Sequence, residues 1–430
     1  MQNRRQFIKS GFSYGAGLLL LKKNNLLRPH RTAQRITNPA KGFHWFGYYD
    51  KFQTDPTDRY VLGMRVAFEG RSPTAQDEVV VGMIDTFDHN RWTDLGTSRA
   101  WGWQQGCMLQ FIPQSLHEVI WNDTENGRYV SRIVNIKTGK KRTLPKPIYA
   151  LSPDGKWGIG TEFNRIQNLR PGYGYAGIED PYLDIKAPKE IGLYKIDLKT
   201  GQNHLLFSIH DIASIPLESS TIVQPSSVLD NFHWFNHLLV NNDGTRFTFL
   251  HRWRAKLEER QTMARTNFVT RMFTADADGQ NLYCIDPSGF TSHFIWKDPH
   301  TICAFTQPHN QPYGFYLLED FTGKTTPIGH TKIPANGHQT YLPVGNGTDW
   351  ILNDNYASPQ NRNQTPYLYR VPTNRRIELG DFPAPAEYFG EWRSDLHPKS
   401  NRNGTKVIFD STHEQKGRQM YMIDIAEAMK

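Results

Sequence analysis

Short stretches of alternating apolar and polar residues run along most of this chain, and many are joined by turns rich in Asp, Asn and Gly. One pair of stretches reads HLLVNNDGTRFTFLHRW from His237, and another reads HPKSNRNGTKVIFDSTH from His397. Alternation with a period of two predicts half-buried β-strands, and an intervening Asn-Gly or Asp-Gly predicts a tight turn. The pattern therefore predicts antiparallel strand pairs.

The same strand–turn–strand unit returns seven times, beginning near residues 44, 104, 149, 237, 293, 338 and 397. A further strand that ends in a turn follows in several units, as in IGLYKIDLKTGQ from Ile191. A repeat of roughly 45–60 residues built only of short strands is typical of a β-propeller blade. The sequence thus predicts an all-β fold, a seven-bladed β-propeller over residues 31–430, in preference to two unrelated β domains.

Two departures from the repeat are informative. The last unit stops after three strands, the third being RQMYMID from Arg418. Propellers avoid a bare sheet edge, so we expect residues 32–36 to supply the missing strand. The second departure is a gap of 88 residues between Tyr149 and His237, which includes the Tyr- and Gly-rich segment RPGYGYAGIEDPYLDIK from Arg170. Long insertions often carry ligand-binding residues, so we expect this one to reach a ligand.

Charge is unevenly distributed along the chain. The net charge is +8, but residues 1–40 contain eight Lys or Arg and no Asp or Glu, which leaves 42 residues of each sign in the remainder. The basic balance therefore gives no support for a nucleic-acid partner. NRRQFIK from Asn3 and GAGLLLL from Gly15 resemble a twin-arginine export signal, and the apolar run is too short to span a bilayer.

These features predict that residues 1–30 are an export signal, with a membrane anchor as the alternative. The mature protein is then a periplasmic or secreted monomer without a membrane span. Three cysteines are too few for a disulfide framework. Cys284 and Cys303 are close enough in sequence to lie on neighbouring blades and could pair, but at least one thiol stays free and export of a folded protein does not require a disulfide.

The first residue of each inner strand lies at one mouth of the central channel of a propeller. Polar residues occupy this position throughout, and four consecutive units place a histidine there. Imidazoles that converge on one axis form a metal site or an acid–base cluster, the alternative being that each bonds a backbone carbonyl. The residues at this position are His44, Gln104 or Gln105, Tyr149, His237, His293, His338 and His397.

Cationic residues recur where the second strand of a unit ends. Arg165 and Arg252 occupy equivalent positions, and His251 precedes Arg252. Arg170 and Tyr173 open the long insertion, whose aromatic residues suit stacking against sugars. A rim of positive charge predicts an acidic ligand, although salt bridges between blades would use the same residue types.

Several segments are similar to a known family. GHQTYLP from Gly337, SHFIW from Ser292 and RSDLHPK from Arg393, with FDSTHE and RQMYMIDI, resemble the seven-bladed propeller polysaccharide lyases, which include oligogalacturonate lyase and the propeller-type ulvan lyases. The resemblance covers residues 40–430. It implies cleavage of an acidic polysaccharide or oligosaccharide by β-elimination, with an ulvan-type or pectic substrate.

The resemblance also implies roles for individual residues. In the ulvan lyases a Tyr and an Arg sixteen residues apart act together, and Tyr149 and Arg165 match that spacing. Those enzymes use nearby histidines where this chain has Gln104 and Gln105, so His44 becomes the candidate base. In oligogalacturonate lyase a metal held by His and Gln binds the substrate carboxylate. The expected ligands of a divalent ion (Zn, Mn or Ca) are His237, His293, His338 and His397, with Gln339 beside them, and the expected substrate-binding residues are Gln104, Gln105, Arg170, Tyr173, His251 and Arg252.

The chemistry explains these residue types. A uronic acid carries a weakly acidic C5 proton beside its carboxylate, and Arg or a metal ion makes its removal accessible by neutralising that carboxylate. A Tyr or His then takes the proton. Two alternatives stay open, namely an exported carbohydrate-binding or scaffold propeller, and a glycoside hydrolase, which needs two carboxylates flanking the bond. Asp50, Glu162 and Asp395 lie near blade mouths without an evident partner.

Overall fold

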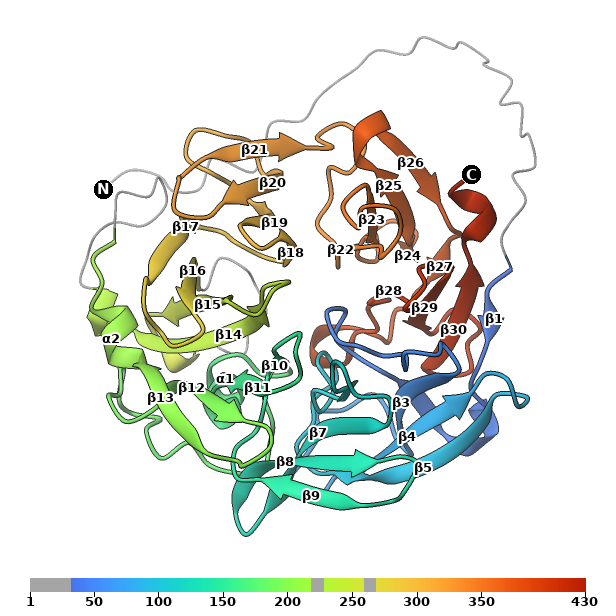
Figure 1. The fold of residues 1–430 in the computed structure, drawn as a ribbon, viewed down its shortest axis with the longest axis horizontal. Coiled ribbons are helices and arrows are strands. Elements are labelled where there is room, and N and C mark those ends of the chain that lie inside the picture. Colours follow the sequence, from blue (N-terminus) through green and yellow to red (C-terminus); the bar gives the residue numbers. More distant parts are fainter. Residues whose placement is uncertain (1–31, 218–227, 259–267) are drawn as a thin grey trace. The chain divides into compact units, whose positions relative to one another are not determined.

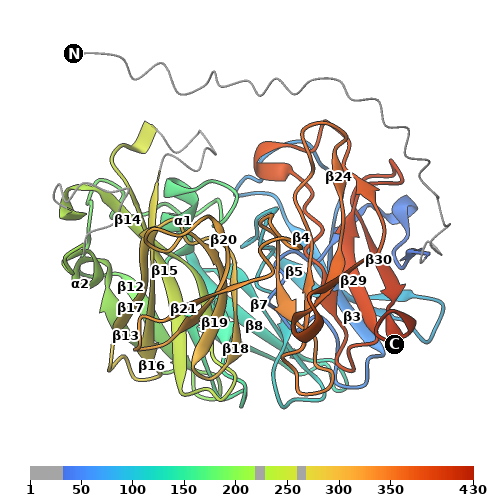
Figure 2. The same cartoon turned by 90° about the horizontal axis from the view of Figure 1, so that it is seen from above.

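The structure is a computed structural model that describes residues 32–217, 228–258 and 268–430. Within these ranges, seven four-stranded antiparallel sheets stand around a central axis as the blades of a propeller (Figure 1). Figure 2, a view turned by 90°, shows that the strands run from one face of the ring toward the other. The predicted seven-bladed fold is confirmed, whereas the predicted export signal lies outside the described residues.

Each of the first three blades takes its strands in chain order. Blade 1 consists of β2 (Phe43–Trp45), β3 (Tyr60–Val66), β4 (Val79–Asp85) and β5 (Arg91–Ser98). Blade 2 consists of β6 (Gln110–Phe111), β7 (Glu118–Glu125), β8 (Arg128–Asn135) and β9 (Lys141–Leu144). Blade 3 consists of β10 (Ala150–Leu151), β11 (Trp157–Gly160), β12 (Gly192–Asp197) and β13 (Asn203–Ser208).

The next three blades repeat this order. Blade 4 consists of β14 (Phe232–Val240), β15 (Arg246–Arg254), β16 (Val269–Asp276) and β17 (Tyr283–Gly289). Blade 5 consists of β18 (Phe294–Asp298), β19 (Thr301–Thr306), β20 (Gly314–Glu319) and β21 (Thr325–Ile328). Blade 6 consists of β22 (Thr340–Tyr341), β23 (Trp350–Asn353), β25 (Tyr367–Arg370) and β26 (Arg375–Glu378), and β24 (Asn363–Gln364) pairs separately with β27 (Phe382–Pro383).

Blade 7 is completed by the N-terminal part of the chain. It contains β28 (Lys399–Ser400), β29 (Lys406–Ser411) and β30 (Gln419–Asp424), and its outer strand is β1 (Gln34–Arg35). Gln34 pairs with Met422, and the Ile36 amide donates to the Met420 carbonyl at 2.9 Å. The prediction that residues 32–36 close the ring is therefore confirmed.

The Asp/Asn-Gly turns between inner strands follow from their sequence. In blade 4, the Asp243 carboxylate accepts from the Thr245 amide at 3.0 Å, and Gly244 adopts φ +77°. Blade 7 repeats this geometry, with the Asn403 side chain accepting from the Thr405 amide and Gly404 at φ +70°. Because a positive φ strains residues with a Cβ, glycine is favoured at this turn position.

Neighbouring blades pack through large apolar side chains with almost no exposed surface. Between blades 1 and 2, the Trp121 ring lies so close to Gly96 that a Cβ on this glycine would come within 2.8 Å of it. Trp121 also donates its indole N–H to the Thr97 carbonyl at 3.0 Å. Packing of this kind fixes each blade against the next and so fixes the inner strands around the channel.

In the described ranges, two short α-helices interrupt the strands. Helix α1 (Phe163–Leu169) follows β11 in the long insertion, where a strand ending at Arg165 was expected, and α2 (Ile209–Ala213) follows β13. Among the residues that the structure describes, no helix combines the length and apolar character that a membrane span requires. Cys284 and Cys303 are not joined by a disulfide in the structure, and Cys107 forms no disulfide either.

Candidate active site

The four predicted histidines come together at the channel. His237 lies at an irregularity within β14, where the strand register shifts and the residue adopts φ +49°. His293 immediately precedes β18, and His338 and His397 each lie two residues before an inner strand. Ring centroids are 6.4 Å apart for His237 and His293, 4.6 Å for His293 and His338, and 4.3 Å for His338 and His397.

Two tyrosines that the sequence did not single out fill the space between these histidines. Tyr48 and Tyr49 come from the irregular segment between β2 and β3, and both are buried. The ring centroid of Tyr48 lies 4.9 Å from that of His237 and 5.7 Å from that of His397. The Tyr49 hydroxyl donates to the Phe294 carbonyl at 2.9 Å, which ties blade 1 to blade 5 across the channel.

A buried carboxylate holds His237 in place. Asp50 accepts a hydrogen bond from Lys51 at 2.7 Å and lies 3.1 Å from Nε2 of His237. Burial alone would raise the pKa of Asp50, but Lys51 and His237 outweigh it and lower the pKa to about 2. Because its Nε2 is bonded to Asp50, His237 has only Nδ1 left for another partner, and this nitrogen lies 3.4 Å from the Tyr48 hydroxyl.

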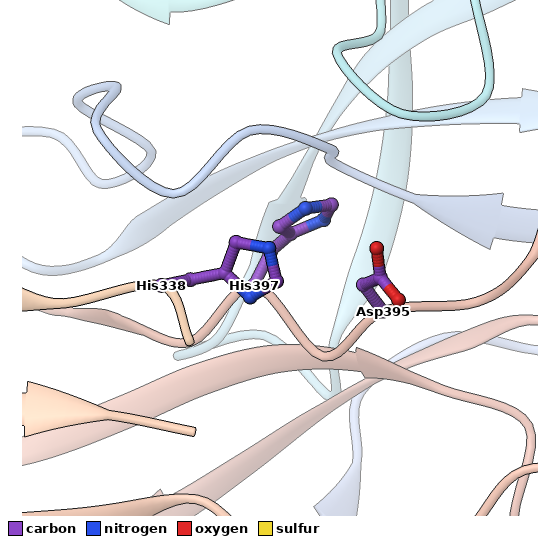
Figure 3. Close-up of side chains that lie close together, drawn as sticks. All are labelled: His338, Asp395 and His397. Carbon is purple, nitrogen blue, oxygen red and sulfur yellow. The ribbon is translucent and has the colours of Figure 1, made fainter. Parts of the chain in front are cut away.

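Two of the histidines form a compact group with a carboxylate. The ligand atoms of His338, Asp395 and His397 all lie within 4.8 Å of one another, and all three residues are buried (Figure 3). Nδ1 of His338 lies 2.9 Å from Oδ1 of Asp354, an arrangement that leaves Nε2 as the metal-binding nitrogen. Burial lowers the pKa of His397 well below its usual value, so its imidazole is neutral, as a metal ligand must be. The donor set therefore fits a divalent ion.

A cavity of about 520 Å³ adjoins this group. Its lining combines three arginines, three tyrosines and one of the four histidines, and the described part of the lining contains no carboxylate. The lining residues are Tyr48, Arg170, Tyr173, Arg252, Phe268, Thr291, Ser292, His293, Asn336, Tyr356, Gly390 and Arg393.

One arginine of the lining, Arg252, lacks a full set of hydrogen-bond partners among the described residues. Arg252, on β15, donates from Nε to the Thr270 hydroxyl at 3.2 Å, but its buried Nη1 has no hydrogen-bond partner among the described residues. Burial lowers the pKa of Arg252 well below its usual value, and the neighbouring Arg170 cation lowers it further. A buried guanidinium without a partner is costly, and an anionic ligand in the cavity would relieve that cost.

The third arginine connects the cavity to the His/Asp group. Arg393 donates from Nη2 to the Tyr173 hydroxyl at 2.8 Å and from Nε to Asp395 at 2.8 Å. Burial would raise the pKa of Tyr173, but Arg170 and Arg393 outweigh it, so the pKa lies below its usual value. Tyr356 differs, because burial and then Asp395 raise its pKa well above the usual value. Of the three lining tyrosines, Tyr173 thus has a lowered pKa, whereas burial raises the pKa of Tyr48 and of Tyr356.

Tyr149 and the two glutamines lie around the cavity without lining it. The buried Tyr149 hydroxyl accepts from Gln105 at 2.7 Å and from the His237 amide at 3.0 Å. Gln104 donates to the carbonyls of Glu391 and Arg393, at 2.8 and 3.1 Å. These contacts support the segment that carries Arg393 and the strand that carries His237.

Arg165 is placed differently from the sequence prediction. It lies in α1 with 1% of its surface exposed, and it forms an ion pair with Asp180 at 3.1 Å. Its remaining donors reach the carbonyls of His233, Tyr182, Ile185 and Lys186, at 2.7 to 2.9 Å. All five guanidinium N–H groups are used, so Arg165 holds the insertion together and has no donor left for a substrate carboxylate.

The two remaining predicted residues also lie outside the cavity lining. The imidazole of His44, on β2, packs edge-on against Trp92, with ring centroids 5.2 Å apart. Burial and the nearby Arg65 cation lower the pKa of His44 to about 4. Nε2 of His251 lies 2.9 Å from Nδ1 of His233, and Nδ1 of His251 lies 3.2 Å from Nη2 of Arg271. The structure therefore brings Arg170, Tyr173, Arg252 and His293 together at the cavity and leaves His44, Arg165 and His251 apart from it.

Comparison with solved structures gives a consistent fold assignment. An oligogalacturonate lyase in complex with manganese superposes with a TM-score of 0.64 at 13% identity, covering 93% of this chain and 94% of that protein. The oligogalacturonate lyase of Vibrio parahaemolyticus gives 0.63 at 14% identity, covering 93% and 95%. The chain has the propeller fold of oligogalacturonate lyase.

A second enzyme class shares this fold. A puromycin-hydrolysing peptidase from Mycobacterium tuberculosis superposes with a TM-score of 0.52 at 11% identity, covering 93% of this chain and 55% of the peptidase. No family model matches the chain, and no curated protein matches it at a significant level. At such low identities the similarity shows a common fold alone, and function has to be argued from the site.

Proposed function

We propose that this protein is a polysaccharide lyase that cleaves a uronic-acid-containing polysaccharide or oligosaccharide, ulvan-type or pectic, by β-elimination. The observation that carries the proposal is Arg252, whose buried Nη1 has no described hydrogen-bond partner, next to a second cation, Arg170, at a cavity whose described lining contains no carboxylate. A uronate carboxylate supplies the missing negative charge. The export signal expected at residues 1–30 agrees with a polymeric substrate outside the cytoplasm.

Binding of the carboxylate lowers the barrier to proton removal. Loss of the C5 proton places a second negative charge beside the carboxylate, and fixed cations stabilise that charge as it develops. Arg252 is well suited to this role because its Nη1 is already desolvated and unpaired. A divalent ion held by His338, Asp395 and His397 would add further positive charge at the carboxylate. Two imidazoles and one carboxylate suit Mn or Zn better than Ca, which takes oxygen ligands.

Tyr173 is the proposed base. Its lowered pKa makes the phenolate available, and the Arg393 hydrogen bond fixes its orientation. The phenolate takes the C5 proton, the electron pair left on C5 forms the C4–C5 double bond, and the C4–O4 bond breaks. The departing O4 then needs a proton, and Tyr356, whose raised pKa keeps it protonated, is the proposed donor in the same cavity. This assignment replaces Tyr149 and His44, which do not line the cavity.

The two alternatives make different demands on the site. A glycoside hydrolase needs two carboxylates flanking the scissile bond, and the described lining has none. A pure binding protein would use the arginines but has no need of a tyrosine with a lowered pKa.

A lyase assay tests the proposal. The purified protein is mixed with a panel of uronic polysaccharides, and the ultraviolet absorbance of the unsaturated product is followed. We expect absorbance to rise with at least one substrate, and to rise more slowly after methyl esterification of the same polymer, because the ester removes the charge that Arg252 binds. Binding without product formation in the presence of Mn²⁺ would favour the binding protein, and reducing ends without unsaturation would favour the hydrolase.

A further inference from the structure

An aromatic pair, the exposed Phe389 and the partly buried Trp392, stands beside the cavity. The side chain of Phe389 is 58% exposed, and its ring centroid lies 5.1 Å from that of Trp392 at an interplanar angle of 61°. The Trp392 indole is fixed in turn, because its N–H donates to the Glu387 carbonyl at 3.1 Å. The Phe389 ring therefore faces solvent in an orientation that the partly buried Trp392 ring supports.

The loop that carries this pair is held by hydrogen bonds from surrounding elements. Arg362 donates to the carbonyls of Ala384 and Tyr388, at 3.1 and 3.0 Å. Arg418, which is buried, donates to the Trp392 carbonyl at 2.8 Å. A loop held at both ends loses little conformational freedom when a ligand binds, so its aromatic rings are preorganised for contact.

The same loop continues directly into the cavity lining. Gly390 follows Phe389, Arg393 follows Trp392, and both of these following residues line the cavity. Gly390 adopts φ +57°, and its carbonyl accepts from Nη1 of Arg393 at 3.4 Å. A saccharide chain that leaves the cavity past Gly390 therefore meets the aromatic pair at once.

We propose that Phe389 and Trp392 form a stacking platform for the sugar ring that follows the reacting uronate on the side away from the scissile bond, a ring that a disaccharide lacks. This inference rests on the proposed function and extends it to the length of the substrate. The apolar C–H face of a pyranose ring covers an aromatic ring and removes both from water. The cavity binds the reacting uronate through charge, and the platform binds its neighbour through apolar contact. The enzyme accordingly prefers substrates that extend beyond a disaccharide.

Chain-length dependence tests this assignment. We compare wild type, Phe389→Ala and Phe389→Tyr on uronic oligosaccharides of increasing length, measuring both kcat/KM and equilibrium binding by calorimetry. Phe87→Ala is the matched control, because Phe87 is 69% exposed and lies in the turn between β4 and β5. Phe389→Ala should lower affinity and kcat/KM for the longer substrates roughly three- to tenfold, the range expected for one aromatic contact. The disaccharide should be unaffected, and Phe389→Tyr and Phe87→Ala should behave as wild type.

The outcomes separate this inference from the proposed function. Unsaturated product with no length-specific loss in Phe389→Ala overturns the platform and leaves the lyase. Length-dependent binding that Phe389→Ala abolishes, without unsaturated product from wild type, supports the platform and overturns the lyase. An equal loss on all lengths, or no binding of any uronic oligosaccharide, overturns the platform as well.

Discussion

Replacing Arg252 with methionine should lower kcat/KM strongly and raise the melting temperature. Methionine keeps the apolar stem and removes a buried guanidinium whose Nη1 has no described partner. A buried unsatisfied donor costs about 1–3 kcal/mol, which the variant recovers. An unfolding entropy of about 2.1 cal/mol/K per residue, over roughly 400 residues, gives about 0.8 kcal/mol/K. The expected increase in Tm is therefore roughly 1–4 °C.

The same change removes a carboxylate contact in a desolvated site. Such a contact contributes about 2–4 kcal/mol to transition-state stabilisation, so kcat/KM should fall roughly 30- to 1000-fold. Thermal unfolding followed by calorimetry and initial rates of product absorbance measure the two effects on one preparation.

Arg165→Met is the matched control, because Arg165 is also a buried arginine close to the insertion. It should have the opposite effect on stability, since the change leaves the Asp180 carboxylate buried without its partner. Breaking a buried ion pair costs about 3–5 kcal/mol, which corresponds to a decrease of roughly 4–6 °C in Tm. A lower Tm in Arg252→Met, or full activity in that variant, would refute the reasoning about an unpaired cation at the cavity.

Four further outcomes are expected. Tyr173→Phe should lose most activity. The wild-type kcat/KM should rise with pH through a pKa below the usual tyrosine value, because the phenolate is the active form. A flat pH profile would argue against Tyr173 as the base. Asp354→Asn should weaken Mn²⁺ affinity roughly 10- to 100-fold in titration calorimetry, as expected when the partner of a metal-binding histidine is lost. His44 has a folded pKa of about 4, below its usual 6.5, so its stabilising effect is complete above pH 6.5 and is lost as pH falls toward 4. His44→Gln should therefore make denaturation midpoints less sensitive to pH in this range. Deleting residues up to 42 removes β1 from blade 7 and should lower Tm markedly. Deleting residues up to 28 leaves β1 in place and should not lower Tm.

The fold could be predicted from the sequence because blades repeat. Strand alternation, Asp/Asn-Gly turns and the missing fourth strand each depend on local residue types, and the structure confirms all three. The convergence of His237, His293, His338 and His397 followed from the same periodicity, since equivalent residues of successive blades must meet at the axis. Periodicity could not show that Asp395 joins two of these histidines, because Asp395 lies in an irregular segment.

Errors occurred where the chain leaves the repeat. The repeat pattern predicts a strand that ends at Arg165, but the structure has helix α1 there. The three-residue spacing of Phe163, Ile166 and Leu169, which is typical of a helix face, was the signal for this helix. His44 was aligned with the other inner residues, but in blade 1 the channel position belongs to Tyr48, four residues later. The role of Arg393 had no local signal, because it depends on contacts with Tyr173, which is 220 positions away in sequence.

Closure of the ring by β1 sets an order of events during synthesis. Gln34 pairs with Met422, so the two sides of this contact are separated by 388 positions along the chain. Joining ends this far apart in a flexible chain costs about 5 kcal/mol, from (3/2)RT ln n, which favours forming the blades between them first. At about 5–20 residues per second, β1 waits roughly 20–80 s before its partner strand exists. Ring closure is therefore the last step of assembly, and until then the outer edge of blade 7 is open to pairing with other chains.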